Sequence, residues 1–115
     1  MLYDLEERTK NFSKNIIICL KKVNQNELNR NIISQLIKSA TSIGANYCEA
    51  NGAASRKDFS NKISICRKEI QETEYWIELM AEVNPEIKID LRKLWKEAHE
   101  LTLIFNKISS SLRSR

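Results

Sequence analysis

The side chains that could do chemistry are few, and their spacing is informative. His99 is the only histidine, and Cys19, Cys48 and Cys66 lie far apart without a Cys-x-x-Cys spacing. A zinc site needs clustered ligands and a di-iron bundle needs Glu-x-x-His, whereas Lys96 stands three residues before His99. A glycine-rich phosphate loop and a Gly-x-Ser-x-Gly elbow are also missing from the sequence. We therefore expect no metal, no cofactor and no enzyme activity.

Two carboxylates remain as candidates for acid and base chemistry. Glu69 and Glu72 are three residues apart, which places them as neighbours on one helical face. A chain with 15 acidic residues contains many such pairs by chance, and His99 is most simply a helical residue facing solvent. A hydrolase or nuclease is therefore the weakest of the three function classes considered below.

The cysteines and the start of the chain indicate the compartment. An odd number of unclustered cysteines fits free core thiols in a reducing cytoplasm. The opening MLYDLEERTK is acidic and poor in apolar residues, unlike a signal peptide, and no apolar run approaches the length of a bilayer span. We expect a soluble cytoplasmic protein.

Helices must position these side chains. The 115 residues suit one domain, 1–115, and two glycines and one proline are too few for a sheet protein with many turns. Apolar residues recur at alternating steps of three and four along four segments. Short links between such stripes favour an all-α, antiparallel up-down-up-down four-helix bundle. The expected helices span residues 3–23, 30–51, 56–83 and 91–112.

Capping residues set several of the predicted helix ends. Ser55 and Asp58 form a variant of the capping box at the start of the third helix. Pro85 ends that helix because it disfavours a helical residue before it. Asp90 is the expected N-cap of the fourth helix, with Ile89 placed to pack on the following turn.

Small side chains gather in the stretch SATSIGANYCEA, residues 39–50. Ala40, Gly44 and Cys48 follow one another at steps of four, so one flank of the second helix lacks bulk for two turns. A glycine inside a helix costs about 1 kcal/mol relative to alanine, so close approach of another helix must compensate. Packing within the chain is the preferred interpretation, and a subunit contact or ligand groove is the alternative.

More apolar side chains are present than one four-helix core requires. Trp76, Trp95, Leu103 and Ile18 fall outside the inner stripes of their helices. Two tryptophans flanked by aliphatic residues would form a contiguous surface patch, and such patches mark association more often than solvent exposure. This pattern predicts self-assembly.

The charges are unevenly distributed, although the net charge is only +4. The third helix is basic over residues 56–68 and carries five glutamates and no base over residues 69–82. This order opposes the helix dipole, so local helix stability does not explain it. In an antiparallel bundle, Arg92, Lys93 and Lys96 could match the acidic half.

The basic half has no such partner. It shares an end of the predicted bundle with Arg8 and Lys10 and with Lys107, Arg113 and Arg115. The interpretations are a solvated charged face or a phosphate-contacting surface, and the latter would show steep salt dependence. The candidate nucleic-acid-binding residues are Arg56, Lys57, Lys62, Arg67 and Lys68.

The stretch QLIKSATSIGANYCEA, followed by SRKDFSNKISICRKEIQETEYWIELM, resembles the bacterial family of 23S rRNA intervening-sequence proteins. This family includes relatives of the accessory variability determinant of diversity-generating retroelements. The agreement covers roughly residues 30–80. The residues at the motif positions are Ser42, Gly44, Asn46, Tyr47, Glu49, Arg56, Lys57, Asp58, Phe59, Glu72, Thr73, Tyr75 and Trp76.

The resemblance implies a small cytoplasmic four-helix bundle that assembles as a homopentameric ring. For the retroelement accessory proteins it also implies binding of nucleic acid and of a reverse transcriptase through a basic surface. We therefore expect a non-enzymatic, self-associating bundle that binds RNA or DNA. The rival is a protein-interaction scaffold, or a reverse-transcriptase accessory protein without direct nucleic-acid binding, whose partner docks on the Trp76 and Trp95 surface.

Overall fold

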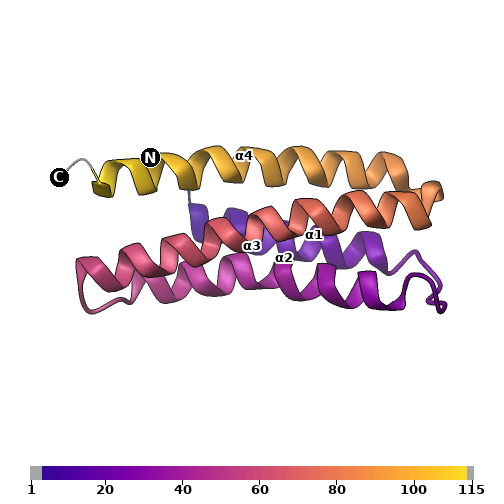
Figure 1. The fold of residues 1–115 in the computed structure, drawn as a ribbon, viewed down its shortest axis with the longest axis horizontal. Helices are drawn as coiled ribbons and strands as arrows, with labels where there is room; N and C mark the ends of the chain where they lie inside the picture. Colours follow the sequence, from indigo (N-terminus) through magenta and orange to yellow (C-terminus); the bar gives the residue numbers. More distant parts are fainter. Residues whose placement is uncertain (1–3, 114–115) are drawn as a thin grey trace.

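The chain forms four helices joined by short links, as seen in a computed structural model that describes residues 4–113. The elements are α1 (Leu5–Leu20), α2 (Arg30–Asn51), α3 (Arg56–Val83), a 3-10 turn η1 (Pro85–Ile87) and α4 (Lys88–Arg113). The helices lie side by side in an elongated body of 47 × 23 × 20 Å (Figure 1). Residues 4–113 contain no strand, so the fold is all-α as predicted.

Two helix starts depend on side-chain caps. The Asp4 carboxylate accepts a hydrogen bond from the backbone N–H of Glu7 at 3.1 Å. The Ser55 hydroxyl accepts one from the backbone N–H of Asp58 at 3.0 Å, which confirms the predicted cap of α3. Each cap satisfies one of the N–H groups that a helix start leaves without a partner.

The predicted start of the fourth helix is wrong. Pro85 opens η1, and α4 follows at Lys88 without a break, so Asp90 lies inside the first turn instead of capping it. The fixed φ of proline suits the first position of a helical turn, which moves the start upstream. The Asp90 carboxylate instead accepts a hydrogen bond from the Lys22 ammonium at 2.8 Å.

The first helix is shorter than expected. It ends at Leu20, three residues before the predicted end, because residues 21–23 form a turn toward the asparagine-rich link. The predicted start at residue 3 lies outside the described residues, and Asp4 is the N-cap. The second and third helices have the predicted bounds of 30–51 and 56–83.

The core lies between the inward stripes of the four helices. Its largest fully buried members include Phe12, Leu36, Ile70 and Phe105, one from each helix. Two threonines are buried among these apolar residues. Thr9 donates to the carbonyl of its own preceding turn, and Thr73 donates to the Ser39 hydroxyl at 2.9 Å, so neither hydroxyl is left unpaired.

Close approach of α1 explains the small residues of α2. A Cβ atom added at Gly44 would lie 3.1 Å from the Thr9 hydroxyl oxygen, which is tighter than ordinary contact. One turn earlier, the Ser13 hydroxyl donates to the carbonyl oxygen of Ala40 at 3.1 Å. The preferred interpretation of this stretch, packing within the chain, is confirmed at Gly44.

A buried amide joins the α1–α2 link to the α3–α4 link, which lie at the same end of the bundle (Figure 1). We call this the far end. Asn29, which is 1% exposed, donates to the Asn84 side-chain oxygen at 2.9 Å and to the carbonyl of Asn24 at 3.1 Å. Asn84 in turn donates to the Glu86 carboxylate at 2.6 Å. The α1–α2 link and the α3–α4 link are therefore tied to each other by side chains.

Candidate nucleic-acid interface

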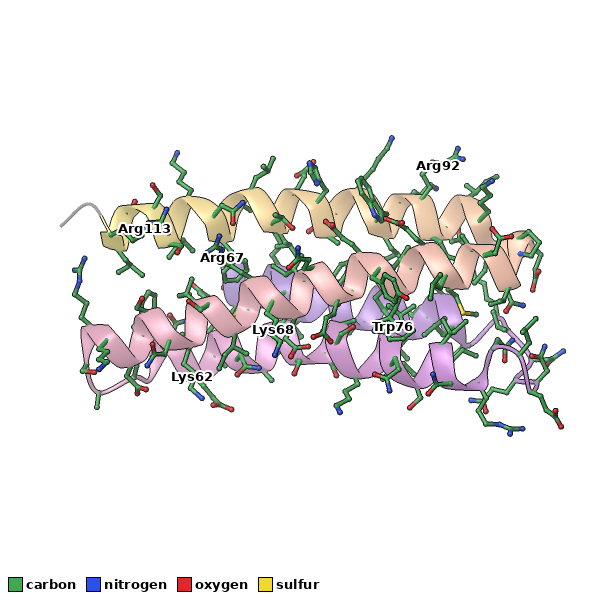
Figure 2. All side chains as sticks on the ribbon, in the orientation of Figure 1. Lys62, Arg67, Lys68, Trp76, Arg92 and Arg113 are labelled. Atoms are coloured by element: carbon green, nitrogen blue, oxygen red, sulfur yellow. The ribbon has the colours of Figure 1, made fainter. Side chains whose placement is uncertain are left out.

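The basic residues of α3 divide between two flanks of the helix. Arg67 points toward α4, whereas Lys62 and Lys68 lie on the side away from it (Figure 2). Neighbours in the sequence are about 100° apart around a helix, so the five predicted residues cannot share one face. They form a cationic end of the bundle rather than a single stripe.

Lys62 and Arg56 each donate a hydrogen bond to an oxygen of another helix, and only the partner of Lys62 is charged. Lys62 donates to the Glu49 carboxylate at 2.7 Å, and this hydrogen bond raises the pKa of the Lys62 ammonium. Arg56 donates to the backbone carbonyl of Leu112 at 2.7 Å, where α4 ends. A cation at a helix C-terminus satisfies an unpaired carbonyl and complements the helix dipole. Lys62 is therefore neutralised, whereas Arg56 keeps its full charge.

Arg67 is held by neutral groups of α4. Its Nε donates to the Asn106 side-chain oxygen at 2.9 Å, and its Nη1 donates to the Ser109 hydroxyl at 3.1 Å. Arg113 donates to the same Ser109 oxygen at 3.2 Å. Two guanidinium groups therefore converge on one hydroxyl, and neither makes an ion pair with any residue in the range 4–113.

Lys57 and Lys68 are exposed, and neither makes a hydrogen bond or ion pair with another described residue. Lys57 lines a surface groove of about 430 Å³ between the start of α3 and the end of α4. The other lining residues are Arg56, Ser60, Asn61, Leu112 and Arg113. We call this the end groove.

The other expected members of the basic end are arranged differently. Arg8 lies against the middle of α4, where it binds Glu97 at 2.7 Å and Glu100 at 2.8 Å, and these contacts raise the pKa of its guanidinium. Lys107 is exposed on α4, and Arg115 lies outside the described residues. Arg8 therefore does not add to the cationic end.

Arg8 spans an open groove between α1 and α4. The groove has a volume of about 660 Å³, and Phe12, Ile18 and Leu94 contribute its apolar surface. A second ion pair, Lys22 with Asp90, crosses it toward the other end. Charged side chains thus connect α1 and α4 across a gap that apolar packing leaves open.

The acidic half of α3 is not matched as predicted. Glu74 accepts a hydrogen bond from the Thr102 hydroxyl at 3.3 Å, and Glu78 accepts one from the Trp95 indole at 3.2 Å. Within residues 4–113, Arg92, Lys93 and Lys96 form no ion pair with these glutamates. Neutral donors of α4 therefore occupy the positions where bases were expected.

The two tryptophans do not form the predicted contiguous patch. Both are half-buried against the core, and Trp95 lies over the α3–α4 contact, where it reaches Glu78. Trp76 is two residues from Glu78, which places it about 200° away around α3. It contacts Tyr75 edge-on at 4.9 Å between ring centroids. The indoles therefore lie on opposite flanks of α3.

His99 is exposed, as predicted, and its imidazole stacks on the Trp95 ring at 5.3 Å between centroids. Its Nδ1 lies 3.8 Å from a Glu74 oxygen. Glu69 is half-buried, and burial followed by the nearby charge of Glu72 raises its pKa. Neither the histidine nor these carboxylates lies among the residues lining the end groove.

The motif residues of α2 serve packing and pairing. The Asn46 side chain donates to the Ser42 carbonyl at 2.8 Å, and Tyr47 meets Phe105 edge-on at 5.6 Å. Glu49 is the carboxylate that pairs with Lys62. On α3, Asp58 and Glu72 are exposed and Phe59 is partly buried against the core. The motif therefore marks helix contacts more than it marks one site.

The cysteines are free, but only two of them are in the core. Cys19 and Cys66 are buried, and burial raises the pKa of the Cys66 thiol to about 12. Cys48 is exposed, so the prediction of a core thiol is wrong there. No cluster of three metal-ligating side chains occurs in the part of the chain that the structure describes. Over the same residues, none of the helices has the length and apolarity to cross a bilayer.

The sequence predicted Arg113 at the cationic end, but it did not predict that Asn106 and Ser109 of α4 hold the arginines there. Asn106, Ser109 and Arg113 follow at steps of three and four, so they form one polar line along α4. That line faces Arg67 of α3. The spacing was visible in the sequence, but the apolar stripe ending in Ile108 and Leu112 directed attention to the neighbouring face.

Comparison with known proteins gives one family and a solved relative. The family model described as 23S rRNA-intervening sequence protein matches residues 3–107. A crystal structure described as a protein with unknown function from the S23 ribosomal protein family of Bacteroides thetaiotaomicron VPI-5482 is 30% identical, with a TM-score of 0.79. The alignment covers 90% of this chain and 96% of that chain. The comparison with curated proteins returned no match.

Proposed function

Because the chain belongs to the family of 23S rRNA-intervening sequence proteins, we propose that it is a non-enzymatic, nucleic-acid-binding bundle that acts through its cationic end. The contacting residues are Arg56, Lys57, Arg67 and Lys68 of α3, joined by Arg113 of α4. Lys62, the fifth residue predicted from the sequence, contributes less because Glu49 neutralises it.

One observation carries this proposal. Neutral oxygens of Asn106, Ser109 and the Leu112 carbonyl hold the arginines at this end in place. The arginines therefore keep their charge, which favours a polyanionic partner. Lys57 and Lys68 add exposed charge along one flank of α3, because eleven residues bring a helix back to nearly the same direction. Such a surface contacts phosphates without reading bases, so binding would depend on salt more than on sequence.

Filter binding of a labelled structured RNA and of a DNA duplex at two salt concentrations tests the proposal. The K57E/K68E variant should weaken binding by about tenfold or more. The plot of log K against log salt should become less steep, by the amount that corresponds to the loss of roughly two phosphate contacts. The variant R92E/K96E is the matched control, because it makes the same charge change on exposed residues at the other end of α4. Absent or salt-independent binding would reject the proposal and favour the protein scaffold.

We also propose that the up-down-up-down bundle is the unit of a larger assembly, a homopentameric ring. Exposed aliphatic side chains support it, because Ile18 and Leu103 are each 57% exposed and Ile89 is 71% exposed. Ile18 borders the α1–α4 groove, whose apolar surface a neighbouring copy could cover. Light scattering tests it, and a mass of one chain, 13.4 kDa, would rule the assembly out.

The rival function has its own support. A scaffold, or a reverse-transcriptase accessory protein without direct nucleic-acid binding, would use the half-buried indoles and the exposed Tyr75, which is 56% exposed beside Trp76. Because Trp76 and Trp95 lie on different flanks of α3, one partner would contact only one of them. If the rival holds, W76A should abolish capture of a purified reverse transcriptase, and the unchanged protein should show no salt-dependent binding of RNA.

A further inference from the structure

The end groove is a strongly cationic concavity. Arg56, Lys57 and Arg113 line it together with Ser60, Asn61 and Leu112, and no carboxylate takes part. The larger α1–α4 groove also has three basic side chains in its lining, but they are offset by Asp4, Glu7, Asp90 and Glu97. The two grooves therefore suit different ligands, and only the end groove suits a compact anion.

Its cations are partly fixed in advance. Arg113 is anchored by the Ser109 hydroxyl, and Arg56 is anchored by the Leu112 carbonyl at 2.7 Å. Each anchor uses one nitrogen of a guanidinium that carries five N–H donors, so donors remain for a ligand. Fixed donors bind more tightly than mobile ones because less side-chain freedom is lost on binding.

A second guanidinium lies directly behind Arg113. Arg67 donates to the same Ser109 hydroxyl, which is 9% exposed, so two like charges meet on one neutral oxygen. Like charges held close together without a counter-ion repel each other. An anion in the end groove would reduce this repulsion. The closeness of Arg67 and Arg113 therefore favours anion binding.

The charge count favours a dianion. Three basic side chains around one small groove exceed what a single phosphodiester, with one negative charge, would neutralise. A terminal phosphomonoester carries about −1.5 to −2 charges at pH 7 and offers three acceptor oxygens. We infer that the end groove binds the terminal phosphate of a nucleic-acid strand. This inference rests on the proposed function, because it specifies which part of the nucleic acid the cationic end holds.

The test compares one short single-stranded oligonucleotide in three forms: with a 5′-phosphate, with a 3′-phosphate and with hydroxyls at both ends. Fluorescence anisotropy measures the affinity of each form. A terminal phosphate at one end or the other should bind about tenfold more tightly than the hydroxyl form, the effect of one or two charge-assisted hydrogen bonds. The advantage should shrink as the pH falls below about 6, where the phosphate loses its second charge.

Two variants locate the effect. R113Q and K57Q should each bring the affinity for the phosphorylated strand close to that for the hydroxyl form. Lys57 makes no hydrogen bond in the described structure, so K57Q tests the groove without disturbing the fold. R92Q is the control, because it removes the same charge from the opposite end of α4 and should preserve the ratio.

The outcomes separate this inference from the proposed function. If all three forms bind equally, or if R113Q and K57Q keep the ratio of affinities, the groove does not hold a terminal phosphate, although the bundle still binds nucleic acid. If no form binds, the proposed function fails and this inference fails with it.

Discussion

Helix α4 meets α1 on one side and α3 on another, and the two contacts treat charge in opposite ways. Toward α1, Arg8 is paired with Glu97 and Lys22 with Asp90, each across an open groove. Toward α3, Arg67 is held by neutral oxygens, and glutamates further along are held by an indole and a hydroxyl. The same chain neutralises charge on one side of α4 and preserves it on the other.

The difference teaches what each contact is for. Where apolar packing is incomplete, as between α1 and α4, opposite charges join the helices and largely neutralise each other. Where packing already holds the helices, neutral groups position the charged side chains and their charge stays available. The cations of the α3–α4 contact are therefore better candidates for ligand binding than the more numerous charges around the α1–α4 groove.

The largest expected effect comes from disturbing the contact between α1 and α2, which holds α1 where its contact with α4 is open. Gly44→Leu should destabilise the fold by about 3 kcal/mol, because a side chain there overlaps the Thr9 hydroxyl and overpacks the contact. Chemical denaturation measures the loss. Ala45→Leu, at the exposed neighbouring position, is the control and should change stability by less than about 0.5 kcal/mol. Equal losses would mean that α1 does not depend on close contact with α2.

Removing one arginine from each contact of α4 sharpens the comparison. Arg8→Gln should cost about 1–2 kcal/mol of stability, because Glu97 loses a charged partner in a partly buried position. Arg67→Gln removes an equally half-buried arginine, but only from neutral partners, and should cost less than about 1 kcal/mol. Denaturation of both variants in one buffer measures the difference, and a larger loss for R67Q would reverse the comparison.

Acid should weaken the pairing at the far end of the bundle. Hydrogen bonds from Lys22 to Asp90 and from Asn84 to Glu86 lower the pKa of each carboxyl below its usual value. The ordinary pKa is 3.8 for Asp90 and 4.5 for Glu86, and both are lower in the folded protein. The stability that these carboxylates contribute is therefore fully present above the ordinary pKa values and is lost as the pH falls through the pKa values of the folded state. Denaturation midpoints between pH 6 and pH 3 should therefore decline. Asp90→Asn should flatten the decline, and an unchanged decline would contradict this assignment.

The smallest expected effect concerns the acidic half of α3. Burial and Glu72 raise the pKa of Glu69, so its charged form is disfavoured in the folded state. Stability from this group should rise as the pH falls through that raised pKa. Glu69→Gln should stabilise the protein by a few tenths of a kcal/mol at pH 7 and remove this contribution. Glu82→Gln, at an exposed position of the same half, should be neutral, and equal gains in both variants would argue against a burial effect.

The helices were largely predictable, because the apolar stripes and the Ser55 cap are local signals. Asp90 was misassigned because a cap and a first-turn acid look alike in sequence, and only the partner, Lys22, distinguishes them. The candidate interface was harder to predict. Charge along α3 is visible in sequence, but which charges are neutralised depends on side chains from other helices, such as Glu49 for Lys62 and Ser109 for Arg67.

The buried amide of Asn29 has a consequence for how the molecule comes apart. It crosslinks the tip of one helical hairpin to the tip of the other through Asn84. Sliding either hairpin along its neighbour by one turn would break this hydrogen bond and leave buried amide groups without partners, which is costly. The hydrogen bond between the tips therefore fixes the position of one hairpin along the axis of the other. We expect the two hairpins to unfold in a single transition.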